Sequence, residues 1–394
     1  MQDIDVLPGT TLPRLPCLDN GMPLAHTPEE LSAWLRLTLE PAIGPATARD
    51  LLREVGLPQR LYSLSRDELA ALLPPPLAAQ LARPLSREQA AVLERTLRWA
   101  ELPGHHLLTL ADAAYPRALL AIHDPPPLLY VAGDPARLSP QAIAIVGARH
   151  ATPDGLANAR AYARHLAQRG WCIVSGLALG IDTAAHEGAL EAGPNAGGTV
   201  AVVGTGVDVV YPPRNQDLAE RIAAQGAVVS EFPLGLPALP HQFPRRNRLV
   251  AGLARGTLVA EAAARSGSLI TARLAADAGR EVFAIPGSIH SPLSRGCHAL
   301  IRQGAKLVES AQDILDELGS PAGPSPLAPA PEPDPARPQD PLLAGMGYGP
   351  IHIDALAART GLAVPALQAR LLELELQGWI ARLDGGRYQI TLGR

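Results

Sequence analysis

The chain has 394 residues, which is too long for one ordinary core, so we expect three domains. Apolar residues make up 47% of it but aromatic residues only 4%, so Leu, Val, Ile and Ala must fill its cores. The net charge of −4 argues against a broadly basic surface for nucleic acid, although residues 241–248 hold three arginines and no acidic residue and can form a local basic site.

The three cysteines, Cys17, Cys172 and Cys297, lie far apart and predict neither a disulfide framework nor a zinc site. No run of 18 apolar residues occurs, which argues against a membrane span. Residues 1–26 lack a basic start followed by an apolar run, so we interpret them as an N-terminal extension and not as a secretion signal. We expect a cytoplasmic protein without a metal or another cofactor.

Residues 27–104 are predicted to form a small helical domain, because apolar residues such as Leu35, Leu39 and Ile43 recur at helical spacing. Residues 40–52 resemble a helix-hairpin-helix, and a SAM-like fold is the alternative. Pro41 and Ala42 stand where the first hairpin glycine is expected, so phosphate contact through this hairpin is doubtful. Between this domain and the next, residues 128–133 are predicted to form an edge strand.

From residue 141 onward, short apolar runs alternate with helical patterns. Strands that are apolar throughout and are joined by helices predict a parallel sheet covered on both faces, so we expect a Rossmann-like, doubly wound, mostly parallel α/β domain over 105–319. The predicted strands are 142–146, 171–174, 199–203, 227–230, 257–261, 281–285 and 305–308. The predicted helices between them are 154–169, 182–191, 215–224 and 269–278.

Residues 320–341 contain nine prolines and predict a semi-rigid linker. Residues 342–394 are predicted to form a winged helix, in which helices over 353–358 and 364–377 precede two strands joined by the turn Asp384-Gly385-Gly386. The second helix carries Arg370 together with Glu373 and Glu375, a poor charge balance for a duplex groove. Protein contacts are the alternative role for this domain.

Small residues follow the predicted strands at the edge where open α/β sheets bind their ligands. Glycine allows an anion to approach the backbone, and helix N-termini attract phosphate, so these loops together predict a phosphate-binding rim. For any one of them taken alone, turn geometry is the favoured explanation. The residues concerned are Gly147, Ser175, Gly176, Gly204, Ser266 and Gly267.

Two further patterns are weaker. Gly204-Thr205-Gly206 does not continue into a complete G-x-G-x-x-G, which argues against a dinucleotide cofactor. Asp182 and His186 are four residues apart on one helix and could form an acid–base pair, but we favour helix capping for Asp182 and a buried polar contact for His186.

Residues 242–256 predict contact with a single strand of nucleic acid. Phe243 can stack on a base while Arg246 and Arg248 contact phosphates, which is how single strands are held without sequence preference. The alternative is a solvated basic start of a helix.

Six segments, in this order, closely resemble the DprA/Smf family and together cover about residues 105–315. They are residues 144–149, 173–190, 197–215, 228–235, 243–287 and 296–308. The resemblance implies a homodimeric bacterial protein, not an enzyme, that binds single-stranded DNA, protects it during natural transformation and helps to load the RecA recombinase.

The resemblance also implies the site residues. The arginine of the family's Gly-Ser/Ala-Arg motif corresponds to Arg149, and the basic residue after its Tyr-Pro pair corresponds to Arg214, where many members have lysine. The family's Arg-Asn-Arg motif corresponds to Arg246, Asn247 and Arg248.

Two other classes of function remain open from the sequence. A Rossmann-like enzyme of the nucleoside monophosphate phosphoribohydrolase type could use the same loops for one phosphate, but it would need a catalytic carboxylate beside them. Glu231 and Glu261 are the acidic residues near predicted strand ends, and the Pro-Gly-Gly-x-Gly-Thr segment of such enzymes is absent. An adaptor that only binds other proteins is the third class.

Overall fold

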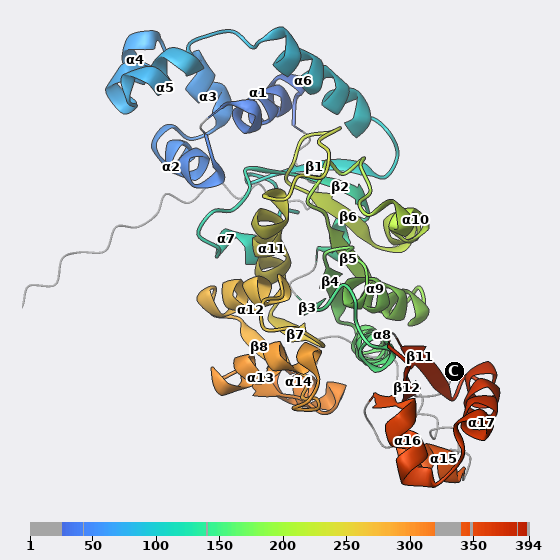
Figure 1. Cartoon of the computed structure of the whole chain (residues 1–394). Helices are drawn as coiled ribbons and strands as arrows, with labels where there is room; N and C mark the ends of the chain where they lie inside the picture. Colours follow the sequence, from blue (N-terminus) through green and yellow to red (C-terminus); the bar gives the residue numbers. More distant parts are fainter. Residues whose placement is uncertain are drawn as a thin grey trace, which may run out of the picture.

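The computed structural model describes residues 26–41, 43–138, 141–319, 340–346, 350–383 and 385–391. Nearly all of the predicted N-terminal extension and linker, and Asp384 of the predicted turn, therefore lie outside the described residues. Figure 1 shows the arrangement of the described parts. In these parts, no helix combines the length and apolar character needed to cross a membrane.

In the described part of the chain six helices precede the sheet, and the first five of them pack around a small apolar core of their own. Thr27 and Glu30 form a reciprocal capping box that starts the first of them. Trp34 and Leu35 on that helix face the sheet and join the helical layer to it. The helices are α1 (Pro28–Leu39), α2 (Pro45–Val55), α3 (Pro58–Ser63), α4 (Arg66–Leu72), α5 (Pro75–Leu81) and α6 (Arg87–Ala100).

A nine-stranded sheet follows, with the strand order β1-β2-β6-β5-β4-β3-β7-β8-β9. Strands β3 to β9 run parallel to one another, whereas β2 is antiparallel to β6 and β1 is antiparallel to β2. The strands are β1 (His105–Thr109), β2 (Leu128–Gly133), β3 (Ala142–Val146), β4 (Cys172–Ser175), β5 (Thr199–Val202), β6 (Ala227–Ser230), β7 (Gly256–Val259), β8 (Glu281–Ala284) and β9 (Lys306–Leu307).

The prediction of an edge strand at 128–133 is wrong. The strand exists as β2, but β1 pairs with its outer side from His105↔Ala132 to Thr109↔Leu128, so that β1 and β9 are the edges. The seven predicted strands and four predicted helices of the α/β core are confirmed, with ends that differ by one or two residues at most.

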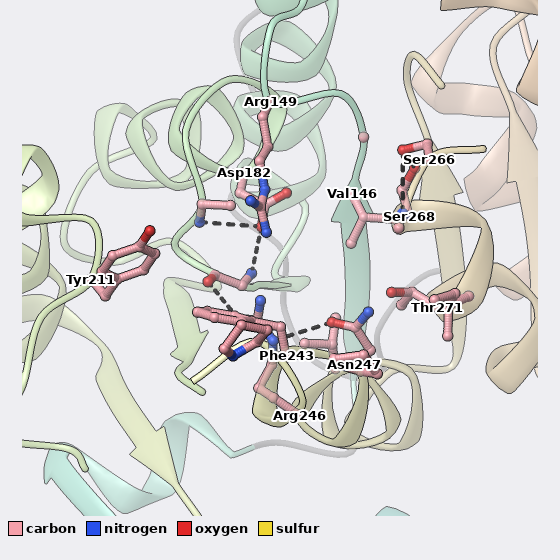
Figure 2. A pocket seen from close by; sticks show the side chains of 18 residues that line it. Val146, Arg149, Asp182, Tyr211, Phe243, Arg246, Asn247, Ser266, Ser268 and Thr271 are labelled. Carbon is pink, nitrogen blue, oxygen red and sulfur yellow. Dashed lines mark hydrogen bonds between the residues drawn. The ribbon is translucent and has the colours of Figure 1, made fainter. Parts of the chain in front are cut away.

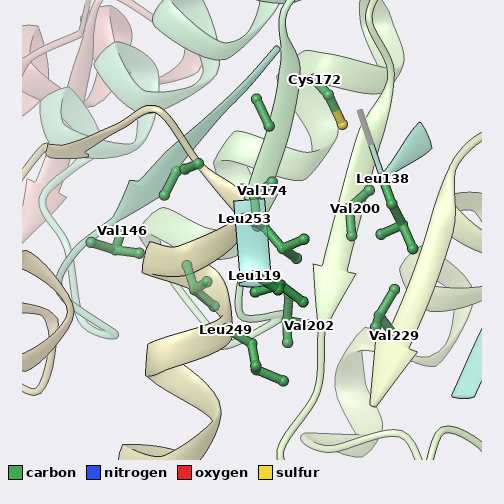
Figure 3. Close-up of a cluster of buried hydrophobic side chains, with 14 of the residues drawn as sticks. Leu119, Leu138, Val146, Cys172, Val174, Val200, Val202, Val229, Leu249 and Leu253 are labelled. Carbon is green, nitrogen blue, oxygen red and sulfur yellow. The ribbon is translucent and has the colours of Figure 1, made fainter. Parts of the chain in front are cut away.

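Helices cover both faces of the sheet. Helices α8, α9 and α14 pack on one face around Trp171, and α7, α11, α12 and α13 pack on the other face (Figure 3). The valines of β3, β4 and β5 and Val229 of β6 point into this second layer against Leu249 of α11. The helices are α7 (Arg117–Leu120), α8 (Pro153–Gln168), α9 (Ile181–Glu191), α10 (Gln216–Gln225), α11 (Gln242–Leu253), α12 (Ser268–Asp277), α13 (Arg295–Arg302) and α14 (Ala311–Leu318).

The C-terminal part is a winged helix, as predicted. Its sheet has the order β10-β12-β11 and closes over an apolar core that includes Leu356, Leu367 and Leu371. Gln389 donates a hydrogen bond to the carboxylate of Asp154 at the start of α8, which brings this part against the α/β core (Figure 1). Its elements are α15 (Pro341–Met346), β10 (Ile351–His352), α16 (Ile353–Thr360), α17 (Val364–Leu376), β11 (Ile380–Leu383) and β12 (Arg387–Ile390).

Candidate nucleic-acid interface

The topology of the sheet opens a cavity between β3 and β7. From β3 the chain proceeds outward through β4, β5 and β6, whereas β7, β8 and β9 extend from its other side. The loops that follow β3 and β7 therefore leave in opposite directions, which is where open α/β sheets bind ligands. A cavity of about 480 Å³ lies here (Figure 2).

Eight of the twelve predicted site residues line this cavity. The loops after three different strands and the first turns of α11 and α12 bring them together, although they are spread over more than 100 residues of sequence. They are Gly147, Arg149, Gly176, Phe243, Arg246, Asn247, Ser266 and Gly267.

An aromatic corner forms one side of the cavity. The ring of Phe243, on the first turn of α11, lies 5.6 Å from that of exposed Tyr211, measured between ring centroids. The guanidinium of exposed Arg149 lies 5.8 Å from the Phe243 ring centroid. Gly204 lies beneath this ring, because a Cβ at Gly204 would come within 3.1 Å of it. Gly204 thus leaves room for the ring of Phe243 to pack against it, and it does not line the cavity itself.

Hydrogen-bond donors form the opposite side (Figure 2). The loop Ser266-Gly267-Ser268 leads into α12, and the hydroxyl groups of its two serines are 2.7 Å apart. Thr271, one turn later, is only 2% exposed, and its hydroxyl has no hydrogen bond within the described residues. The N–H groups of Ser268, Leu269 and Ile270 already bond within the loop. The N–H of Gly267 and the nearby hydroxyls are therefore the donors that suit an anion such as phosphate.

Arg246 supports the floor of the cavity from inside the protein. It is 5% exposed, and its guanidinium donates hydrogen bonds to the carbonyl groups of Gly176 and Val202 at the ends of β4 and β5. A Cβ at Gly176 would lie 2.3 Å from this guanidinium, so any larger residue there would displace it from these two carbonyl groups. Burial lowers the pKa of Arg246 to about 10, which leaves it charged at neutral pH.

Asn247 is oriented by its neighbour. Its Oδ1 accepts a hydrogen bond of 3.2 Å from Nε of Arg246, which identifies the other end of the amide as the NH₂ group. This NH₂ group makes no hydrogen bond within the described part of the chain, and the residue lines the cavity. Asn247 therefore offers donors to a ligand.

The other predicted arginines lie elsewhere. Arg214 is exposed on the 3₁₀ turn Pro213–Asn215, three residues after Tyr211, so it stands beside the cavity without lining it. Arg248 is paired with Asp124 and Glu231 inside the protein. Ser175 is also interior, because its buried hydroxyl donates a 2.6 Å hydrogen bond to the carbonyl of Ile145. The side chains of Arg248 and Ser175 thus hold the fold together, and we leave both out of the proposed site.

Both acidic residues considered for catalysis are engaged within the structure. Glu231 is paired with Arg248, and Glu261 accepts hydrogen bonds from the backbone N–H of Thr152 at 2.9 Å and from its hydroxyl at 2.6 Å. Burial raises the pKa of both carboxyl groups. Neither lines the cavity.

Asp182 has a structural role, as we favoured from the sequence, but it does not fill this role as the predicted helix cap. Its carboxylate accepts hydrogen bonds from the N–H groups of Gly176 and Ala178, at 3.1 and 3.3 Å. It therefore orders the loop after β4, whereas the prediction had it capping its own helix, whose N-cap is Gly180. Burial raises the pKa of Asp182, against the opposing charge of Arg246.

Ten lining residues are not among the predicted site residues, and three of these ten carry a hydroxyl group: Tyr211, Ser268 and Thr271. A signal for two of them existed, because Ser268 and Thr271 lie on the first turn of a predicted helix directly after Gly267. Tyr211 carried no comparable signal, since only the path of the chain after β5 brings it opposite Phe243.

Comparisons with known proteins match nearly the whole described core. A family model described as DNA recombination-mediator protein A matches residues 106–319, and one described as DprA winged helix domain matches residues 326–386. Protein Smf of Escherichia coli (strain K12) is 45% identical over 303 residues, which cover 75% of this chain and 80% of that protein.

Streptococcus pneumoniae supplies a second relative and a solved structure. Its DNA processing protein DprA (strain ATCC BAA-255 / R6) is 48% identical over 210 residues, which cover 53% of this chain and 73% of that protein. The X-ray structure of DNA processing protein A from this species superposes with a TM-score of 0.62 at 37% identity, and covers 75% of this chain and 99% of that one.

Proposed function

Because this chain belongs to the DprA/Smf family of DNA-processing proteins, we propose that it is a binding protein for single-stranded DNA that acts as a recombination mediator and not as an enzyme. One observation carries the proposal. At the carboxyl edge of the sheet, a single cavity combines an aromatic corner of Phe243 and Tyr211, the cation of Arg149 and a wall of hydrogen-bond donors.

The aromatic corner favours a single strand over a duplex. Stacking on Phe243 requires an open face of a base, and in a duplex neighbouring base pairs cover both faces. The ring is held from below by Gly204 and from the side by Tyr211, so it is placed before any ligand arrives. Each base–aromatic stack contributes on the order of 1–3 kcal/mol.

The phosphates would be held by groups that carry no sequence information. Arg149 and Arg214 are exposed, and neither forms an ion pair with another described residue. The donors around Gly267 and Thr271 and the NH₂ group of Asn247 suit the non-bridging phosphate oxygens. Binding should therefore weaken with salt and depend little on base sequence.

The mediator role is the finer part of the proposal. We propose that the protein protects incoming single strands during natural transformation in the cytoplasm and assists loading of RecA onto them. Support comes from the description of the matching family as a recombination mediator. The test is RecA nucleation on DNA coated with single-strand-binding protein, which should be faster when this protein is added and unchanged if the role is wrong.

We also propose that the protein is a homodimer, joined at the β9 edge of the sheet. Among the described residues no strand pairs with the outer side of this edge strand, which carries Leu307 at 44% exposure. Ile289, in the loop between β8 and α13, is 75% exposed. Exposed apolar side chains at an open sheet edge suit a second protein surface.

Nucleotide hydrolysis gains no support from this geometry. Glu261 is held by Thr152 at the start of α8, and Glu231 is held by Arg248, so neither carboxylate is placed to act on a nucleotide in the cavity. Release of free base from nucleoside monophosphates, lost in Glu261→Gln, would overturn this preference.

The DNA-binding proposal is tested with fluorescence anisotropy of a labelled oligo-dT. The double variant Arg149→Ala, Arg214→Ala should bind at least tenfold more weakly than the wild type, which corresponds to about 1.4 kcal/mol. Arg164→Ala is the matched control, because Arg164 is an exposed arginine of α8 that does not line the cavity. Equal affinity of the double variant and the control would remove the proposed site, and equal affinity for a duplex of the same length would remove the preference for single strands.

A further inference from the structure

The loop between β6 and α11, residues 231–241, leads the chain to the aromatic corner of the cavity. Pro240, near its end, lines the cavity, and Phe243 follows on the first turn of α11. The place of the Phe243 ring therefore depends on the course of this loop, which we call the β6–α11 loop.

The last part of the β6–α11 loop is stiff. The N–H of Leu239 donates a 3.0 Å hydrogen bond to the side chain of Gln242, and the carbonyl of Leu239 accepts one of 3.0 Å from the N–H of Gln242. Gln242 is only 2% exposed. Pro237, between these bonds and residues 234–236, has a fixed φ angle. A displacement of residues 234–236 is therefore passed on to Phe243.

The loop after β5 holds the middle of the β6–α11 loop from within the α/β core. The N–H of Gly206 donates a 2.9 Å hydrogen bond to the carbonyl of Leu236. The carboxylate of Asp208 accepts one of 2.8 Å from the N–H of Gly235. Gly235 has a φ of +77°, a backbone conformation that glycine adopts without strain.

Arg95 of α6 holds the same part of the loop from the helical layer. Its Nη2 donates a 2.6 Å hydrogen bond to the carbonyl of buried Leu234. A Cβ at Gly235 would lie 3.3 Å from this nitrogen, so the guanidinium lies close against the loop. Hydrogen bonds from a charged donor are the stronger class. Arg95 does not line the cavity, so the loop is its route to a ligand there.

Helix α6 is itself seated on the sheet. Leu93 and Leu97 pack against the apolar cluster that joins the helical layer to the sheet, and Thr96 between them is fully buried. Figure 1 shows α6 beside β1. Arg95 therefore extends from a helix whose position is fixed by packing.

We propose that Arg95 is a positioning residue for single-stranded DNA, through which the helical layer holds the β6–α11 loop and the Phe243 ring in place. This role rests on the proposed function, in which Phe243 stacks on a base. Without the guanidinium the loop keeps its bonds to the loop after β5 but loses its contact with α6. The ring is then less well placed before DNA arrives, and binding must supply the missing order.

The contact is tested first in the full chain without DNA. Hydrogen exchange of the amides within residues 235–239 should become about fivefold faster in Arg95→Ala. Arg98→Ala is the matched control, because Arg98 is an exposed arginine of the same helix that pairs with Glu94, and it should leave this exchange unchanged. Equal exchange in the two variants would overturn the proposed role of Arg95.

A double-mutant cycle then separates positioning from a general loss of binding. The affinity for labelled oligo-dT should fall about fivefold in Arg95→Ala, but by less than about twofold when Phe243→Ala is already present, because no ring remains to be positioned. In an Arg214→Ala background the loss should stay at about fivefold, and Arg98→Ala should bind as the wild type does. Losses of equal size in the two backgrounds would mean that Arg95 acts by its own charge or on the whole fold, and would overturn the role.

The same measurements distinguish this role from the proposed function. A wild type that does not bind oligo-dT, or a Phe243→Ala variant that binds as tightly as the wild type, would overturn the proposed stacking of a single strand and the role of Arg95 with it. Binding that depends on Phe243 but is unchanged in Arg95→Ala would overturn the role of Arg95 alone.

Discussion

The neighbours of His186 determine its protonation state. The hydroxyl of Thr199 donates its proton to the carbonyl of Ile173 at 2.7 Å, so Nδ1 of His186, 2.7 Å from that hydroxyl, must be the donor. Its Nε2 is buried without a partner in the described structure. Burial, aided by the nearby charge of Arg246, lowers the pKa of His186 from 6.5 to about 3. The folded protein therefore keeps this ring neutral.

This state makes stability depend on pH with a definite sign. In the unfolded chain His186 binds a proton below about pH 6.5, whereas in the folded protein it does so only near pH 3. The free energy of unfolding therefore decreases as the pH falls between these two values. We expect the stability advantage of the wild type over His186→Gln to shrink by about 1.4 kcal/mol per pH unit over this window. Urea unfolding of both proteins from pH 7.5 to pH 4.5 measures it. Parallel curves for the two proteins would contradict the assignment.

Among the site residues, sequence patterns identified the loops but not the direction of each side chain. Arg149, Arg246 and Arg248 look alike in the sequence as candidate phosphate ligands. In the structure Arg149 is exposed, Arg246 binds two strand-end carbonyl groups and Arg248 is paired with Glu231. The packing of α11 against β4 and β5 decides which arginine faces the cavity. Local sequence does not predict that packing.

The start of α8 is held by two hydrogen bonds that share the hydroxyl of Thr152. The hydroxyl of Thr152 accepts a hydrogen bond from the N–H of Gly155 at 3.0 Å and donates one to Glu261 in the loop after β7. This links the first turn of α8 to the loop on the other side of the sheet's switch point. A larger residue at Gly155 would displace the Glu261 carboxylate, because a Cβ there would lie 2.3 Å from it.

Removing the Thr152 hydroxyl should therefore loosen the first turn of α8. Thr152→Ala loses the helix cap and one partner of a partly buried carboxylate, and should cost about 1–2 kcal/mol. Thr152→Ser, the matched control, retains the hydroxyl and both hydrogen bonds. Hydrogen exchange of the amides at 154–158 should become at least fivefold faster in the alanine variant only. Equal protection in the two variants would show that the cap contributes nothing.

Elements with a strong apolar pattern were predicted well, and elements defined by pairing were not. The continuous runs of β3, β4 and β5 mark buried parallel strands, and they are present to within a residue or two. By contrast, β1 begins with His105 and His106 and acquires its role only by pairing with β2. Local patterns reveal burial, but they do not reveal which strand lies outermost.

At the scale of the whole molecule, a net charge of −4 is compatible with the proposed site for a polyanion, because the exposed cations Arg149 and Arg214 lie in loops at the carboxyl edge of the sheet. Only a local positive potential is needed to hold a few phosphates. One such cavity contacts a short stretch of strand, so a second cavity in the same assembly would raise the affinity for long strands much more than for short ones.

The proposed homodimer makes this difference measurable. Mass photometry of the wild type should show a species of about 83 kDa, twice the mass of the 41.3 kDa chain. The variant Ile289→Asp, Leu307→Asp places charge at the open β9 edge and should give the monomer mass, whereas Leu120→Asp, at a leucine that is 50% exposed on α7, should remain dimeric. The monomeric variant should bind a short oligo-dT as the wild type does but lose at least tenfold in affinity for a long one, because each chain then binds with a single cavity. A wild type that is monomeric, or a double variant that still forms the 83 kDa species, would show that the β9 edge does not join two chains.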